Sequence, residues 1–145
     1  MKILVAYDGF EHSDAAVRVA TELFTPGAEV TVLSVVPPDA HGSKSGGHVG
    51  LAPHAHEDVA RAHAALRANG IASRMEIAHG DVVDSICAAA ADGGYDLVVV
   101  GSRRLGAVSR LALGSVSGEL VRRAPCPVLV APKDREGRAE ALGSQ

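Results

Sequence analysis

Short apolar runs alternate along the chain with segments whose apolar residues recur every three or four positions. A run that is apolar without polar alternation is typical of a strand buried on both faces, as in a parallel sheet. Four such runs are residues 2–7, 30–36, 96–100 and 127–131. A fifth run, 71–78, contains three polar residues and is predicted to be an edge strand.

The intervening segments predict four helices. In the first, Ala16, Val19 or Ala20, and Leu23 lie at helical spacing. Ser13 is predicted to cap this helix. Asp81 is predicted to cap the third helix in the same way. Strands and helices therefore alternate from the first strand to the fifth. This order predicts an α/β fold with a parallel sheet and right-handed crossovers. The other apolar faces expected to point inward are Val59, Ala62 and Leu66; Val82, Ile86 and Ala89 or Ala90; and Val116, Leu120 and Ala124.

The length of 145 residues predicts a single domain, which we place at residues 1–132. Within it, residues 37–54 have no period and are rich in Gly, Ser and His. We expect this segment to be a long mobile loop, with a helix after it. Residues 133–145 are predicted to form a polar C-terminal tail.

Composition and charge narrow the class of protein. With 47% hydrophobic and 21% charged residues, the chain has the composition of a globular domain. A net charge of −3, 3% aromatic residues and no Trp argue against nucleic-acid binding by bulk charge or base stacking. The longest apolar run is six residues, so no membrane span is expected. The run at 2–7 is too short for a signal peptide, and we expect a cytoplasmic protein.

Two segments are expected to meet at a binding site. In open parallel sheets, ligands bind beyond the carboxyl ends of the strands, where the strand order reverses. If the first and fourth strands form the central pair, Tyr7, Asp8 and Gly9 would face the segment 101–117 there. Asp8 can accept a hydrogen bond from a ribose hydroxyl or an adenine amino group.

The segment 101–117 has the properties of a phosphate site. It leads through glycines into a predicted helix, whose first amides and dipole favour an anion. Ser115 and Ser117 can add hydroxyl donors. Residues 101–124 also hold five arginines against Glu119 alone, a local charge of +4. Such a turn is a weak signal by itself, because it follows no Walker or G-x-G-x-x-G pattern.

Several motifs together resemble the universal stress protein family. They are Asp8-Gly9, Gly80-Asp81, the run 96–103, Leu113-Gly114-Ser115-Val116-Ser117 and Ala124-Pro125-Cys126-Pro127-Val128-Leu129-Val130. The resemblance extends from Lys2 to about Pro132. It implies a Rossmann-like, adenine nucleotide alpha hydrolase-like sheet of five parallel strands in the order 3-2-1-4-5. It also implies a homodimer and, for many members, ATP binding through Gly-x2-Gly-x9-Gly-[Ser/Thr].

The resemblance implies a set of nucleotide-binding residues. Ala6 and Asp8 would lie near the adenosine, Val35 beside the base and Val100 under the ribose. Gly101 matches the first motif glycine, and Gly114, Ser115 and Val116 would face the phosphates. The remaining two residues expected at the site are Arg103 and Arg104.

Arg104 stands where the family motif has its second glycine. If the backbone there needs a positive φ, the loop shifts and the side chain can occupy the phosphate space. Alternatively, the Arg104 guanidinium donates charge-assisted hydrogen bonds to a phosphate. Three hypotheses follow: a regulatory module that binds ATP, with Mg2+, or AMP with weakened affinity; a dimeric scaffold without nucleotide; or a slow ATPase that phosphorylates itself on Ser115 or Ser117. No activated nucleophile or carboxylate pair for Mg2+ is evident, so at most weak turnover is expected.

Other candidate sites are weaker. Cys87 and Cys126 are too few for a disulfide framework and are predicted to be buried and inert. A bare apolar strand at 128–130 (Val128, Leu129, Val130) is expected to pair with a second copy of the chain. The histidines of residues 37–54 could hold a metal or could belong to a solvated loop, and their irregular spacing favours the loop, so no metal site is expected. These histidines are His41, His48 and His54, with His56 just beyond.

Overall fold

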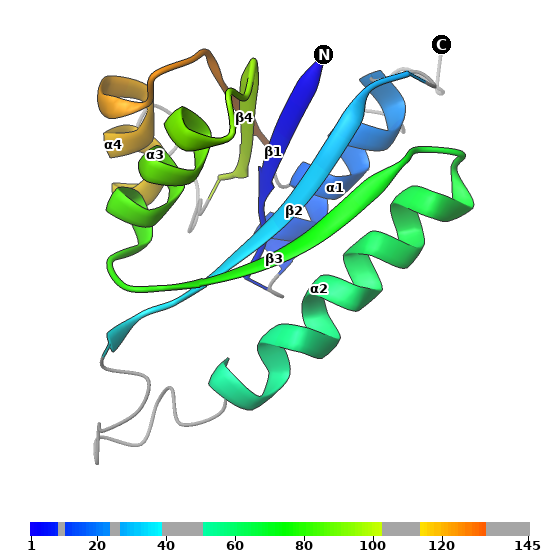
Figure 1. The fold of residues 1–145 in the computed structure, drawn as a ribbon, viewed down its shortest axis with the longest axis horizontal. Helices are drawn as coiled ribbons and strands as arrows, with labels where there is room; N and C mark the ends of the chain where they lie inside the picture. Colours follow the sequence, from blue (N-terminus) through cyan, green and yellow to red (C-terminus); the bar gives the residue numbers. More distant parts are fainter. Residues whose placement is uncertain (9–10, 24–26, 39–50, 103–113, 133–145) are drawn as a thin grey trace, which may run out of the picture.

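The computed structural model describes residues 1–8, 11–23, 27–38, 51–102 and 114–132. Strands and helices alternate throughout, as the apolar pattern predicts, and Figure 1 shows them around one central sheet. The elements in chain order are β1 (Lys2–Ala6), α1 (Glu11–Leu23), β2 (Glu29–Val36), α2 (Leu51–Ala68), β3 (Ser73–His79), α3 (Val82–Asp92), β4 (Leu97–Gly101), α4 (Ser115–Arg123) and β5 (Val128–Ala131).

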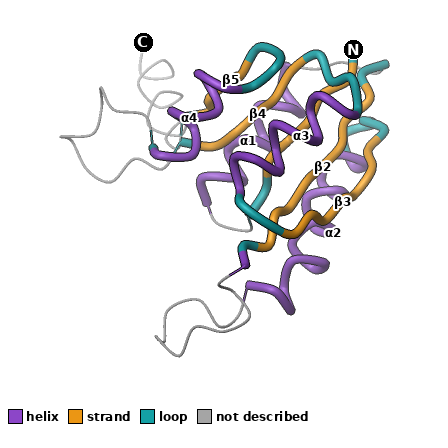
Figure 2. Tube along the Cα trace, turned by 60° about the vertical axis from the view of Figure 1, so that its left-hand side comes forward, coloured by secondary structure: helices purple, strands orange, loops and turns teal. Residues whose placement is uncertain are grey.

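The five strands form one parallel sheet in the order β3-β2-β1-β4-β5. Figure 2 shows this order from β3 at the lower right to β5 at the upper left. The prediction that the first and fourth strands form the central pair is confirmed, with Leu4 of β1 in register with Val98 of β4. The predicted edge positions of the third and fifth strands are confirmed as well. The strand order therefore reverses between β1 and β4, which is where ligands bind in such sheets.

Each face of the sheet carries its own apolar core, because successive strand side chains point to opposite faces. On one face, Ile3 and Val99 pack with α1 and α2, and on the other, Leu4 and Val98 pack with α3 and α4. Figure 1 shows the two pairs of helices on opposite sides of the strands. Near the carboxyl end of each strand, alternate side chains therefore point either toward α1 and α2 or toward α3 and α4.

Two helix boundaries differ from the sequence prediction. Helix α1 already begins at Glu11, so Ser13 is a buried residue of its first turn and not its N-cap. Helix α2 begins at Leu51, so residues 51–54, predicted as loop, are helical. Pro53 fits there because the first amides of a helix have no intrahelical acceptor. Residues 39–50 and 133–145 of the predicted loop and tail lie outside the described residues.

Other helix predictions are confirmed in part. Asp81 caps α3, with its Oδ1 accepting from the backbone N–H of Asp84 at 2.9 Å. Ala16 and Ala20 are buried as predicted, but Leu23 at the end of α1 is 54% exposed. No helix in the described part of the chain is long and apolar enough to cross a bilayer.

The amino end of the sheet is fixed by a polar cluster around Tyr95. The backbone N–H of Lys2 donates to Asp96 Oδ2 at 2.8 Å, and the Lys2 ammonium lies 5.0 Å from the centre of the Tyr95 ring. The Tyr95 hydroxyl donates to Thr31 Oγ1 at 2.7 Å. At Gly93, an added Cβ would overlap the Tyr95 ring. This cluster fixes the starts of β1, β2 and β4, at the opposite end of the strands from the site described next.

Candidate functional site

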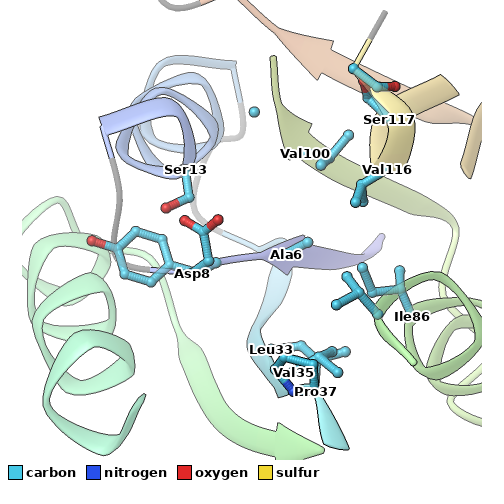
Figure 3. A pocket seen from close by; sticks show the side chains of 14 residues that line it. Ala6, Asp8, Ser13, Leu33, Val35, Pro37, Ile86, Val100, Val116 and Ser117 are labelled. Atoms are coloured by element: carbon cyan, nitrogen blue, oxygen red, sulfur yellow. The ribbon is translucent and has the colours of Figure 1, made fainter. Parts of the chain in front are cut away.

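A pocket of about 140 Å3 opens at the carboxyl ends of β1, β2 and β4. It lies between these strand ends and the first turns of α1, α3 and α4 (Figure 3). The position follows from the topology, because β1 and β4 are neighbours whose following segments run to opposite faces of the sheet.

The inner wall of the pocket is apolar. Leu33 and Val35 of β2 and Val100 of β4 lie on the face covered by α3 and α4, where Ile86 and Val116 complete the wall. Ala6 ends the central strand on the same face, and its single methyl group leaves room between these larger side chains. Such a slot accepts a flat apolar group such as a nucleobase.

The rim of the pocket is polar. Asp8 follows β1, and Ser13 enters from the first turn of α1 on the same side (Figure 3). On the other side, the Ser117 hydroxyl donates to the Gly114 carbonyl at 3.2 Å. Gly114 is the N-cap of α4 and has no side chain to accept from the first amides of the helix. These amides and the helix dipole favour an anion at this side of the pocket.

Tyr7 fixes the backbone just before Asp8. Its N–H donates to the Leu33 carbonyl at 2.9 Å, which extends the β1–β2 ladder by one residue. Its hydroxyl donates to Asp14 Oδ1 of α1 at 2.5 Å and accepts from Arg61 of α2 at 3.2 Å. Burial, together with the Asp14 carboxylate, raises the pKa of Tyr7 to about 12. The phenol is therefore neutral at physiological pH and ties both helices to the end of β1.

The structure brings most of the predicted site residues together. Ser115 instead lines an adjoining groove, which Asp81, Glu119 and Arg123 line as well. Arg103 and Arg104 lie outside the described residues, so both interpretations of Arg104 stay predictions. The predicted residues that line the pocket are Ala6, Asp8, Val35, Val100, Gly101, Gly114 and Val116.

Other lining residues were not predicted as part of the site. Val82 and Ile86 were expected only as the buried face of a helix, and Ser13 as a cap. Tyr7, expected at the site together with Asp8 and Gly9, does line the pocket, whereas Leu33 reads in sequence as an ordinary strand residue. Only the spatial arrangement of the strand ends and first helical turns assigns them to the pocket wall.

An open groove of about 530 Å3 adjoins the pocket and shares Pro37, Val82 and Val116 with it. At its edge, the Arg123 guanidinium pairs with Asp84 of α3 and, at 3.2 Å, with Glu119 of α4. Both carboxylates raise the pKa of Arg123, although all three groups are exposed. Arg123, one of the five arginines of residues 101–124, thus links α4 to α3.

Neither cysteine has the environment of a reactive thiol. Cys87 and Cys126 are free, partly buried, and packed against the core beneath α3 and α4. Burial raises the pKa of Cys126, which favours the protonated thiol. Within the described residues, no three His, Cys, Asp or Glu side chains form a metal-binding group. His41 and His48 lie outside that part of the chain.

The sequence profile described as "Universal stress protein family" matches residues 1–132. The chain belongs to the universal stress protein family. It is similar to a universal stress protein of Thermus aquaticus, with 34% identity over 131 residues that cover 88% of this chain and 96% of the relative.

Solved structures of universal stress proteins share the fold. One is an Arabidopsis thaliana family protein with AMP bound, at 21% identity and a TM-score of 0.72, covering 94% of each chain. Another is a universal stress protein in complex with cAMP, at 21% identity and a TM-score of 0.70, covering 92% of this chain and 98% of the other. The predicted fold class, sheet order and family are therefore confirmed.

Proposed function

We propose that this universal stress protein is a regulatory module that binds an adenine nucleotide, ATP or AMP, in the pocket between β1 and β4. The observation that carries the proposal is the juxtaposition in one pocket of an apolar slot, the Asp8 carboxylate and the start of α4. Two structures that share this fold hold AMP and cAMP, which supports the same ligand class here.

The residues of the pocket fit the parts of a nucleotide. The base would lie in the slot beside Val35 and Ile86, with Ala6 below it. Asp8 would accept from the ribose or the base, and Val100 would lie beneath the ribose. The phosphates would face Gly114, Ser115 and Val116, where the helix dipole favours negative charge, and Mg2+ would accompany ATP. A pocket of 140 Å3 is smaller than the roughly 300–1,000 Å3 of most ligand sites. We therefore assign it to the base and ribose, with the phosphates outside it, near the start of α4.

Binding rather than turnover is the proposed role. The Ser117 hydroxyl is bonded to a backbone carbonyl and not to a general base. Ser115 begins α4, and among the described residues its hydroxyl has no hydrogen bond to a general base. Any ATP hydrolysis or self-phosphorylation on these serines would therefore be slow.

We further propose a homodimer through β5. This strand is an edge of the sheet, and Val128, Leu129 and Val130 are each only partly buried. Pairing of β5 with the β5 of a second copy would give hydrogen-bond partners to the backbone groups of this edge and cover these side chains. The free thiols of Cys87 and Cys126 accord with a reducing compartment, and we propose the cytoplasm.

Calorimetric titration with ATP and AMP tests the nucleotide proposal. The wild type is expected to bind, and Ala6→Leu, which fills the slot, is expected to abolish binding. Val121→Ala is the matched control, because Val121 is 51% exposed on α4 and does not line the pocket. If neither the wild type nor Arg104→Gly binds ATP or AMP, the proposed nucleotide-binding module is refuted. Binding to Arg104→Gly alone would favour the scaffold without nucleotide.

A further inference from the structure

In the described part of the chain, strand β3 has an open edge along its full length. It stands first in the order β3-β2-β1-β4-β5 and pairs with β2 in unbroken register from Ser73 to His79. Figure 2 shows it at the outer edge of the sheet. An edge strand can pair with another chain, and proteins usually prevent this with proline, a bulge or charged side chains. Here there is neither proline nor bulge, and the two charged residues, Arg74 and Glu76, have opposite signs.

The backbone groups of alternate β3 residues point to this open edge. The Gly80 N–H donates to the Val36 carbonyl of β2 at 3.0 Å, which shows which residues of the parallel ladder face β2. Two-residue steps back along the strand bring the N–H and C=O of Glu76 and Arg74 to the same side. The N–H and C=O of Met75, between them, therefore point away from the sheet, where a further strand can bind them.

Met75 is the centre of a symmetric charge pattern on this edge. Its side chain is 51% exposed and shares the face of Ile77, which packs against the core beneath α2. Arg74 and Glu76, on either side of Met75, are both exposed and point to the opposite face. Helix α2 packs against β2 as well as β3, so it covers the strand pair and leaves the edge open.

We propose that β3 binds the β3 of a second copy of this chain in antiparallel orientation, about a two-fold axis at Met75. Met75 then lies opposite the partner's Met75, and each backbone donates its N–H to the carbonyl of the other. Arg74 lies opposite the partner's Glu76, and Glu76 opposite the partner's Arg74. These positions form the pairs without backbone hydrogen bonds, in which facing side chains are closest. Opposite charges there stabilise the pairing, and like charges destabilise it.

The charges select both the register and the partner. A two-fold axis at Arg74 would place two arginines directly opposite each other, and an axis at Glu76 would do the same with two glutamates. An axis at Ile77 would leave both charges without a charged residue opposite. Because a strand pairs with its own copy in this way only when its charges are arranged symmetrically, the pattern favours a second copy over an unrelated strand.

The contact would extend the assembly proposed above. The strands β3 and β5 form opposite edges of the sheet, so pairing through both would join copies into a longer continuous sheet. A single strand pair is a small interface, and we expect a dissociation constant of about 0.1–1 mM. At micromolar concentration the β3 contact is therefore open. The inference does not depend on nucleotide binding.

Charge exchange on the Leu129→Lys background, where the β5 contact is expected to be lost, tests the pairing. Analytical ultracentrifugation measures how the average mass rises with concentration. Arg74→Glu and Glu76→Arg, each alone, are expected to weaken the association about tenfold or more, because like charges then face each other. An equimolar mixture of the two variants is expected to restore it, because two negative residues then face two positive ones. Arg122→Glu, the same charge change on an exposed residue of α4, is the matched control and should have no effect.

Cross-linking in the otherwise unchanged protein tests the register independently. A residue on the axis lies opposite its own copy with a Cα separation of about 5.5 Å, which a disulfide can span. Met75→Cys is therefore expected to form a cross-linked dimer when oxidised with diamide. His79→Cys, an exposed position at the end of the same strand and far from the axis, is expected not to. The wild type, with Cys87 and Cys126, shows whether the native thiols cross-link.

Several results would overturn the inference. One is a Leu129→Lys protein that remains monomeric at about 1 mM. Another is a mixture of Arg74→Glu and Glu76→Arg that associates no better than either variant alone, or a control that weakens association equally. Equal cross-linking of Met75→Cys and His79→Cys would exclude the register centred on Met75. Each of these results would leave the nucleotide proposal intact, because that proposal is tested by calorimetry on a different part of the molecule.

Discussion

Replacing Tyr7 by phenylalanine removes the hydroxyl that connects β1 to α1 and α2 and keeps the buried ring. Hydrogen bonds to charged groups contribute about 1.5–3 kcal/mol each. Here Asp14 is exposed and can be rehydrated, and Arg61 retains Asp58 at 3.4 Å. We therefore expect Tyr7→Phe to lower the free energy of unfolding by about 1 to 1.5 kcal/mol at neutral pH, at or below the lower end of that range.

The pH dependence of this difference tests its cause. The pKa of Tyr7 is raised from 10.0 to about 12 in the folded protein. The folded state therefore holds the phenolic proton more tightly than the unfolded state does. Its stabilising contribution is complete below pH 10 and is lost as the pH rises from 10 through 12. The wild type should lose its advantage over Tyr7→Phe in this interval, and titrations common to both proteins cancel in the difference.

Urea unfolding followed by circular dichroism, at a series of pH values from 7 to 11, measures the two free energies. The chain has two tyrosines and no tryptophan, so in Tyr95→Phe the phenolate absorbance reports Tyr7 alone. Its ionisation midpoint should lie well above 10. A midpoint near 10, or a stability difference that is constant across the series, would refute the role given to the hydroxyl.

Three further substitutions test other parts of the account. Gly93→Ala should lower the free energy of unfolding by about 1–3 kcal/mol, because the added Cβ overlaps the Tyr95 ring. Urea unfolding measures this difference, and a smaller loss would contradict the close contact. Asp81→Ala should cost about 1 kcal/mol through loss of the α3 cap, whereas Asp81→Asn, which can still cap, should cost less; equal costs would argue against capping. Leu129→Lys should give a monomer in analytical ultracentrifugation where the wild type is a dimer, and a wild-type monomer at micromolar concentration would contradict the β5 interface.

The sequence predicts the framework of this fold because strand and helix periodicities are local signals. Apolar runs such as 96–100 specify a strand buried on both faces, and Asp81 specifies the start of a helix. The strand order came from the family resemblance, since no periodicity records which strands are neighbours. Helix starts were less certain: Ser13 has the chemistry of a cap, yet α1 begins two residues earlier and buries it.

The candidate site was predicted only where a motif or the family resemblance identified it. Asp8, Gly101 and Gly114 follow from glycine and aspartate positions at strand and helix ends. Leu33 and Ile86 did not, because an apolar residue that lines a pocket has the same sequence pattern as one in the core.

The central claim is that an adenine nucleotide occupies the pocket at the carboxyl ends of β1 and β4. Amide chemical shifts of the isotopically labelled protein, followed by nuclear magnetic resonance during titration with AMP, test it directly. The account predicts saturable shifts at Asp8, Val35 and residues 114–117, with Lys2 and Tyr95 at the opposite end of the strands unchanged. A spectrum that AMP leaves unaltered, or shifts confined to that opposite end, would contradict it.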